Sequence, residues 1–178
     1  MKTELSDLGT RICIIGPSNS GKSTLADRLA DKVGGQVCHL DQLAHKPHTN
    51  WERRPEEDFI SDHNIFIRQD VWVIDGNYSI CMPQRFERST AVIWLDLPLI
   101  GFLWRYIARS VKNDPNRIGN LSGAKGQFSF GLIKYTFFRY PKNRKTYENL
   151  LSGYKNTFIR IGSMKELNKC YADWGLKI

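Results

Sequence analysis

The sequence lacks the features that would place the protein in a membrane or outside the cell. Its apolar runs stay well short of the ~18–20 residues that a membrane-spanning helix needs. Its first residues are polar and carry charges of both signs, without the apolar core of a secretory signal peptide. The cysteines Cys13, Cys38, Cys81 and Cys170 are far apart, and no two form a C-x-x-C pair. We therefore expect reduced thiols in a cytoplasmic protein with no membrane partner.

The sequence also shows no internal repeat and no low-complexity tract. Its 178 residues correspond to one domain, and 41% hydrophobic residues are enough to bury a core. We therefore expect a single domain over residues 1–178.

Acidic residues are scarce in one segment of the chain. Between Arg105 and Lys145, ten lysines and arginines accompany one acid, Asp114, and the net charge of the whole chain is +8 at pH 7. Such a segment predicts an anionic partner, which can be nucleotide phosphates, nucleic acid or an acidic surface.

The most informative motif follows an apolar run at residues 12–15. Residues 16–24 (GPSNSGKST) fit the pattern G-x-x-x-x-G-K-[ST] at every fixed position. The glycines let successive N–H groups point at one anion, and the following helix adds its positive end. Lys22 would reach the terminal phosphates of ATP, and the Ser23 hydroxyl would bind Mg²⁺. A turn with a chance lysine is the alternative, and the flanking strand and helix disfavour it. The expected ATP-binding residues are Gly16, Ser18, Asn19, Ser20, Gly21, Lys22, Ser23 and Thr24.

Apolar strands alternate with helices along the chain. We expect strands at residues 11–15, 36–40, 71–74, 90–95 and 154–161. We expect helices at residues 22–32, 55–69, 99–111, 132–151 and 163–174, with an interruption near Pro141. This alternation predicts an α/β fold, in which helices cover both faces of a parallel sheet. Residues 113–130 are rich in Gly, Asn, Ser and Lys, and we expect them to form a mobile lid.

Acidic residues follow three of the expected strands. Asp41, Asp75 and Asp96 should lie near the phosphate loop, because ligands bind at the carboxyl ends of parallel strands. We favour Asp75 as the residue that holds Mg²⁺ through water. Asp41 could accept a proton from a substrate hydroxyl or hold the substrate, and Asp96 is the third candidate. The alternative for each is an acid that caps the next helix.

Basic residues supply the remaining candidates. Arg105 and Arg109 are four residues apart on an expected helix, so they share a face and could clamp the phosphoryl oxygens. The alternative is a solvated basic stripe. Arg117 and Lys125 would be contacts of the lid, and Arg85 and Arg88 could meet the acceptor substrate.

Two other patterns are interpreted as structural. His45 and His48 are three residues apart, but no third metal ligand lies at a convincing spacing. Aromatic residues at positions 128–140 interleave with basic ones and could stack on nucleic-acid bases, but such a cluster is more often the core face of a helix.

Four segments of the sequence resemble those of a known family. They are the phosphate loop, HLDQL at 39–43, IDGNY at 74–78, and WLDLP at 94–98 with the expected helix of Arg105 and Arg109. Over most of the chain, up to about Tyr147, the sequence resembles the adenylate-kinase-related P-loop proteins called topology modulation proteins. The resemblance implies a nucleoside-monophosphate-kinase-like fold with a five-stranded parallel sheet in the order 2-3-1-4-5 and a basic lid. It also implies binding of ATP with Mg²⁺, with Asp75 near the metal. Adenylate kinases continue the Asp-Gly of the third strand with Phe-Pro-Arg, whereas this chain has Asn77-Tyr78-Ser79.

These patterns predict an ATP-dependent phosphotransferase with an unidentified small-molecule acceptor, which could be a nucleotide. Its expected catalytic residues are Lys22, Asp41, Asp75, Arg105 and Arg109, and its expected metal-site residues are Ser23 and Asp75. A nucleic-acid-binding P-loop ATPase or regulator that affects DNA topology is the first alternative, and the basic segment from Arg105 to Lys145 would carry it. A nucleotide-binding protein without turnover is the second.

Overall fold

The computed structural model describes residues 3–98, 101, 121 and 140–177. Its strands are β1 (Arg11–Ile15), β2 (Gln36–His39), β3 (Trp72–Asp75), β4 (Ala91–Leu95) and β5 (Thr157–Ile161). The helices of these residues are η1 (Leu5–Leu8), α1 (Lys22–Val33), α2 (Leu40–Leu43), α3 (Glu56–Phe66), η2 (Ser79–Cys81), α4 (Met82–Arg88), α7 (Tyr140–Leu151) and α8 (Met164–Asp173).

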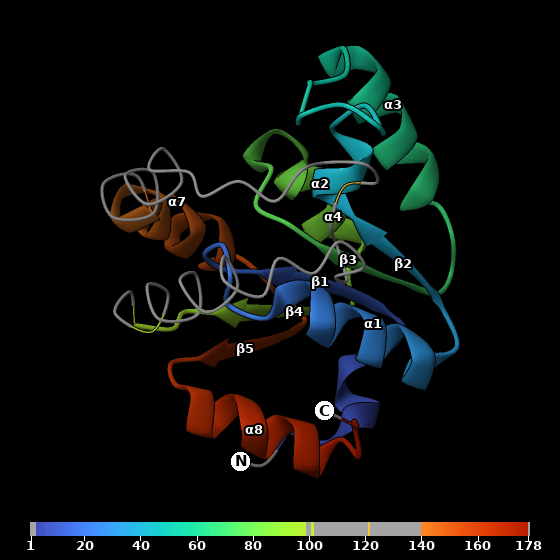
Figure 1. The fold of residues 1–178 in the computed structure, drawn as a ribbon. Helices are drawn as coiled ribbons and strands as arrows, with labels where there is room; N and C mark the ends of the chain where they lie inside the picture. The colour runs from blue at the N-terminus through green and yellow to red at the C-terminus, as the bar shows by residue number, and fades with distance from the viewer. Residues whose placement is uncertain (1–2, 99–100, 102–120, 122–139, 178) are drawn as a thin grey trace.

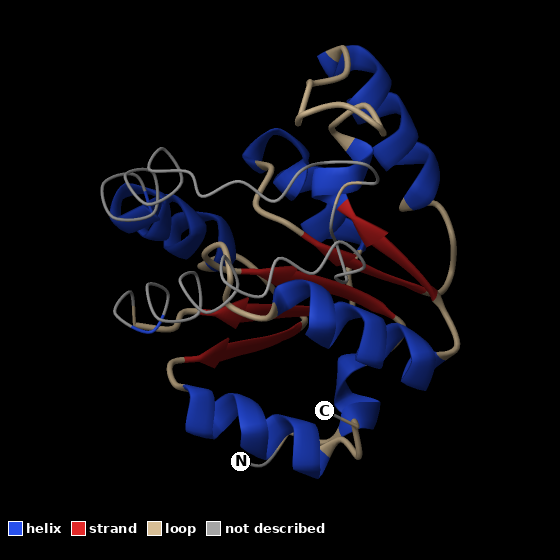
Figure 2. Ribbon diagram, in the orientation of Figure 1, coloured by secondary structure: helices blue, strands red, loops and turns tan. Residues whose placement is uncertain are grey.

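All five strands of the described residues run parallel in one sheet, in the order β2-β3-β1-β4-β5 (Figures 1 and 2). The expected α/β fold and the strand order 2-3-1-4-5 are therefore confirmed. Because β1 is central, the loop that follows it emerges in the middle of the carboxyl edge, where parallel sheets bind ligands.

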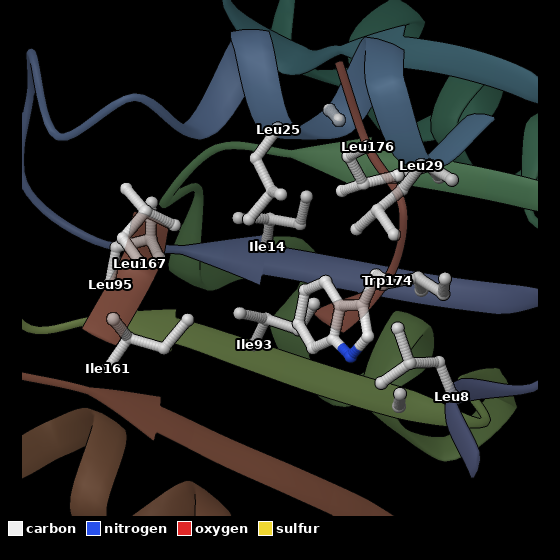
Figure 3. Packing of buried hydrophobic residues seen from close by; sticks show 14 of the residues in the cluster. Leu8, Ile14, Leu25, Leu29, Ile93, Leu95, Ile161, Leu167, Trp174 and Leu176 are labelled. Atoms are coloured by element: carbon white, nitrogen blue, oxygen red, sulfur yellow. The ribbon is translucent and has the colours of Figure 1, made fainter. Parts of the chain in front are cut away.

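Alternate residues of β1 enter two different cores. Ile12 and Ile14 pack with η1, α1 and α8 on one face (Figure 3), whereas Cys13 and Ile15 pack with α2, α3, α4 and α7 on the other. This two-sided burial explains the continuous apolar run before the phosphate loop. The clusters bury the central strand on both faces, and this packing positions the start of the phosphate loop.

The boundaries of four strands differ from the expected ones: β3 is shifted by one residue and β4 begins one residue later, whereas β2 and β5 differ for local reasons. β2 ends at His39, because Leu40 is fully buried and begins the short helix α2, which places Asp41 in the first turn of that helix. β5 begins at Thr157 instead of residue 154, since the Tyr154 hydroxyl and the Asn156 amide donate to the Ser89 carbonyl before the ladder starts.

Apart from residues 101 and 121, the expected helix at 99–111 and the expected lid at 113–130 lie outside the described residues, and so do Arg105, Arg109, Arg117 and Lys125. In the part of the chain that the structure describes, no helix is both long enough and apolar enough to cross a membrane.

Candidate functional site

The phosphate loop leaves the sheet directly after β1 and ends in the first turn of α1. Gly16, Ser18, Asn19, Ser20 and Gly21 form the loop, and Lys22, Ser23 and Thr24 begin the helix. The backbone at Gly16 has φ +148°, and a Cβ atom there would lie 2.5 Å from the Leu95 carbonyl oxygen, so only glycine fits this approach to β4. The Lys22 ammonium folds over the loop and donates to the Pro17 carbonyl oxygen at 2.9 Å.

Asp75 lies beside this loop because of the strand register. β3 pairs with β1 so that Asp75 is opposite Ile14, two residues before the loop begins. The Ser23 hydroxyl donates to Asp75 Oδ2 at 2.8 Å, and Asp75 is 5% exposed. The half-buried hydroxyl of the helix and the buried carboxylate of the strand therefore lie in one corner of the site.

His39 extends this contact into a chain of polar groups. Its Nδ1 lies 2.5 Å from Asp75 Oδ1, and its Nε2 lies 3.0 Å from Asp27 Oδ1 on α1. Burial alone lowers the pKa of His39, but the hydrogen bond and charge of Asp75, together with Asp27, outweigh burial and raise that pKa above its ordinary value. A histidine between two carboxylates balances part of their charge and fixes the orientation of Asp75.

The residues after β3 contact both the phosphate loop and α2. The Asn77 side chain bonds to the backbone of Gly16, and the Tyr78 hydroxyl donates to Asp41 Oδ1 at 2.9 Å. Asp41 is exposed at the same carboxyl edge of the sheet, two residues after His39. The structure thus brings Lys22, Ser23, Asp75 and Asp41 into one neighbourhood.

Asp96 belongs to a separate cluster at the ends of β4 and β5. Its buried carboxylate accepts from Arg144 at 2.7 Å, from Arg160 at 2.6 Å and from the Tyr140 hydroxyl at 3.2 Å. The Arg160 guanidinium also lies 4.4 Å from the centre of the Trp94 ring. These contacts tie α7 to the sheet, so Asp96 has a structural role in the described residues.

The side chains of Arg85 and Arg88 donate hydrogen bonds to backbone carbonyl groups of this chain. Arg85 is fully buried, and its Nη2 donates to the Gly76 carbonyl oxygen at 2.7 Å. Arg88 Nε donates to the Ile67 carbonyl oxygen at 2.6 Å, at the end of α3. The Arg85 guanidinium is therefore covered by the fold, whereas Arg88 is exposed and donates to the end of α3, so its contact with an acceptor stays a prediction.

Sequence reasoning missed the roles of His39, Asp27 and Asn77. A signal for the first two was present, because His39 and Asp75 end adjacent parallel strands in register and Asp27 is four residues after Ser23 on one helix face. The Asn77 contact carries no such signal, since it depends on the path of a loop.

Comparison with known proteins adds information on the fold. A family model described as RNA helicase matches residues 12–96, which span β1 to the end of β4. The curated proteins compared with this chain include no match.

Among solved structures, the chain is similar to shikimate kinase from Acinetobacter baumannii in complex with shikimate. The TM-score is 0.55 at 13% identity, over 93% of this chain and 91% of that one. It is also similar to a sugar kinase from Janibacter sp. HTCC2649, with a TM-score of 0.46 at 14% identity, over 92% of this chain and 93% of that one. The strand order together with the likeness to shikimate kinase shows a P-loop kinase-like fold.

Proposed function

We propose that this protein is an ATP-dependent phosphotransferase that acts on a small-molecule acceptor. The observation that carries the proposal is the 2.8 Å hydrogen bond from the Ser23 hydroxyl to Asp75 at the foot of the phosphate loop. A hydroxyl at the start of the helix and a carboxylate at the end of a neighbouring strand are the pair that P-loop enzymes use to hold Mg²⁺.

The donor atoms fit Mg²⁺, since a hydroxyl and a carboxylate are hard oxygen ligands. In the described residues no group of three or more His, Cys, Asp or Glu side chains could hold a metal ion, and Mg²⁺ commonly takes substrate phosphates and water as further ligands. Ser23 would bind the ion, and Asp75 would hold its waters. Bound Mg²⁺ would neutralise charge on the β- and γ-phosphates of ATP.

The other residues have distinct proposed roles. The backbone N–H groups from Ser18 to Thr24 would hold the phosphates, and Lys22 would move from the Pro17 carbonyl to the terminal phosphates. Asp41 would orient an acceptor hydroxyl and take up its proton, while the Tyr78 hydroxyl donates to Asp41 Oδ1 and holds it in place. Arg105 and Arg109 would stabilise the transferring phosphoryl group from the lid side.

An acceptor screen tests the proposal. ADP formation would be followed with Mg²⁺ and ATP across a panel of nucleosides, nucleoside monophosphates, sugars and hydroxy acids that includes shikimate. We expect one class to stimulate ADP release, and we expect Lys22→Ala to lower that rate by at least about 100-fold. Lys32→Ala, at the exposed last turn of the same helix, is the matched control and should retain the wild-type rate. The proposal would be wrong if no acceptor stimulated ADP release and Lys22→Ala released ADP at the wild-type rate.

The second candidate is a nucleic-acid-binding P-loop ATPase. The RNA helicase model matched over residues 12–96 and the basic segment from Arg105 to Lys145 favour it, as does the resemblance to topology modulation proteins. Gel-shift assays with RNA and DNA at 50 mM and 200 mM salt decide between the two, because phosphate contacts weaken steeply as salt rises. Absence of binding even at the lower salt concentration removes this candidate.

A further inference from the structure

The phosphate loop begins at a residue whose two backbone polar groups are held by one side chain. The Gly16 N–H donates to Asn77 Oδ1 at 3.0 Å, and Asn77 Nδ2 donates to the Gly16 carbonyl oxygen at 2.5 Å. Gly16 is buried and follows directly after the last residue of β1, where its backbone turns away from the sheet ladder. Buried backbone groups need partners, and Asn77 supplies both of them.

This pairing requires a primary amide. The Gly16 N–H needs an acceptor, its carbonyl needs a donor, and Asn carries one of each on adjacent atoms. Aspartate has the same shape without a donor, and its charge would face a carbonyl oxygen. The Gly16 N–H belongs to the peptide that precedes Gly16 and the Gly16 carbonyl to the peptide that follows it, so the two hydrogen bonds from one planar amide fix the orientation of both peptide planes.

Asn77 is itself held by the residues around it. The preceding residues are anchored by the contact of Asp75 with Ser23 and by the fully buried Arg85, which donates to the Gly76 carbonyl. A side chain at Gly76 would lie 2.9 Å from the Leu40 Cβ, so the backbone passes close to α2. The segment from Asp75 to Asn77, at and just after the end of β3, therefore contacts the phosphate loop at both of its ends, at Gly16 and at Ser23.

We propose that Asn77 is a positioning residue for nucleotide binding, which sets the orientation of the two peptides that flank Gly16 and so preorganises the N–H groups of the following loop that receive the phosphates. The inference rests on the proposed binding of ATP and adds a residue that does not touch the nucleotide. A loop held in its binding conformation loses less entropy when the ligand binds. The hydrogen bonds of Asn77 should therefore increase the affinity for the nucleotide as well as the stability of the folded protein.

Calorimetric titration of wild type and Asn77→Ala with Mg²⁺–ATP and with Mg²⁺–ADP tests the proposal. We expect both nucleotides to bind about tenfold more weakly to Asn77→Ala, because two hydrogen bonds that order the loop are lost. Asn156→Ala is the matched control, since Asn156 also donates to a backbone carbonyl, that of Ser89 at 2.8 Å, at the opposite edge of the sheet. It should lower the melting temperature without changing either dissociation constant.

A second variant keeps the test decisive if Asn77→Ala does not fold. Asn77→Asp retains the acceptor for the Gly16 N–H and replaces the donor by a charged oxygen that faces the Gly16 carbonyl, so we expect weaker nucleotide binding. Wild-type affinity in either folded Asn77 variant, within about twofold, overturns the inference. Absence of ATP binding by the wild type overturns the proposed function and this inference with it, whereas normal binding by wild type and variants alike overturns the inference alone.

Discussion

Asp75 shows at the scale of single residues how one carboxylate can serve two partners. One oxygen of this buried side chain faces His39 and the other accepts from Ser23, and both partners are half-buried. The side chain is therefore oriented from two sides before any ligand binds. Such outer partners of a metal site set how well its direct ligands perform.

The change Asp75→Asn keeps the shape of this side chain and removes its charge. We expect the affinity for Mg²⁺, measured as the Mg²⁺ concentration that gives half-maximal ATP binding, to fall about 10- to 100-fold. Asp70→Asn is the control, because Asp70 is exposed just before β3. A Mg²⁺ requirement equal to that of wild type would remove Asp75 from the proposed metal site.

The cysteines allow a second test at the residue scale. Burial raises the pKa of the Cys13 and Cys38 thiols to about 12 each; the charge of Asp75 adds to this at Cys38, and the charge of Arg85 opposes it at both. Only the thiolate reacts readily, so both thiols should be inert near neutral pH. Iodoacetamide at pH 8, followed by mass spectrometry, should label half-buried Cys170 first and label Cys13 and Cys38 only in urea. Equal labelling of all three cysteines in the native protein would contradict this burial.

At the scale of an element, α3 is held by few buried side chains. Phe59 and His63 are its buried residues, and the His63 side chain is fully covered. Burial lowers the pKa of His63 below its ordinary value, the charge of Arg85 adds to this, and the hydrogen bond with Asn64 opposes it. Protonation of His63 therefore disfavours the folded state.

This packing predicts a pH dependence of stability. The unfolded chain binds a proton at His63 near pH 6.5, whereas the folded chain binds it only at lower pH. The contribution of His63 is therefore fully present above pH 6.5 and is lost as the pH falls from 6.5 through the folded pKa. Urea unfolding at pH 7.5 and 5.5 should show a smaller pH-dependent loss in His63→Gln than in wild type, and exposed His48→Gln should behave as wild type. An identical loss in all three proteins would show that His63 does not titrate in this way.

At the scale of the whole molecule, the central position of β1 makes the site depend on the complete sheet. Segments around residues 16–24, 39–41 and 75–78 meet only when β2, β3 and β1 are aligned. A ligand that binds these segments binds the folded state alone and stabilises it by mass action.

Mg²⁺–ATP at 100 times its dissociation constant should therefore raise the melting temperature by about 5 to 10 °C, which corresponds to roughly 2.7 kcal/mol for a chain of this size. Differential scanning fluorimetry of wild type and Lys22→Ala checks this, and the variant should melt at the same temperature with and without the nucleotide. An equal shift in both proteins would mean that the stabilising site is not the phosphate loop.

The sequence by itself determined the phosphate loop, the alternation of strands and helices and the parallel α/β class. These features follow from contiguous residues, because a tight turn, a helix start and a buried strand are set by neighbours along the chain. The acids that follow the strands could also be placed at one edge of the sheet from the sequence.

Only the tertiary structure decided which of these residues meet. It joins Asp75 to Ser23 and His39, and it places Asp96 with Arg144 and Arg160. It also buries Arg85, which donates to the Gly76 carbonyl, and brings the Asn77 side chain to Gly16. The physical reason is that such contacts depend on the register of strands far apart in sequence and on the paths of the loops between them. No periodicity within a single segment encodes that register.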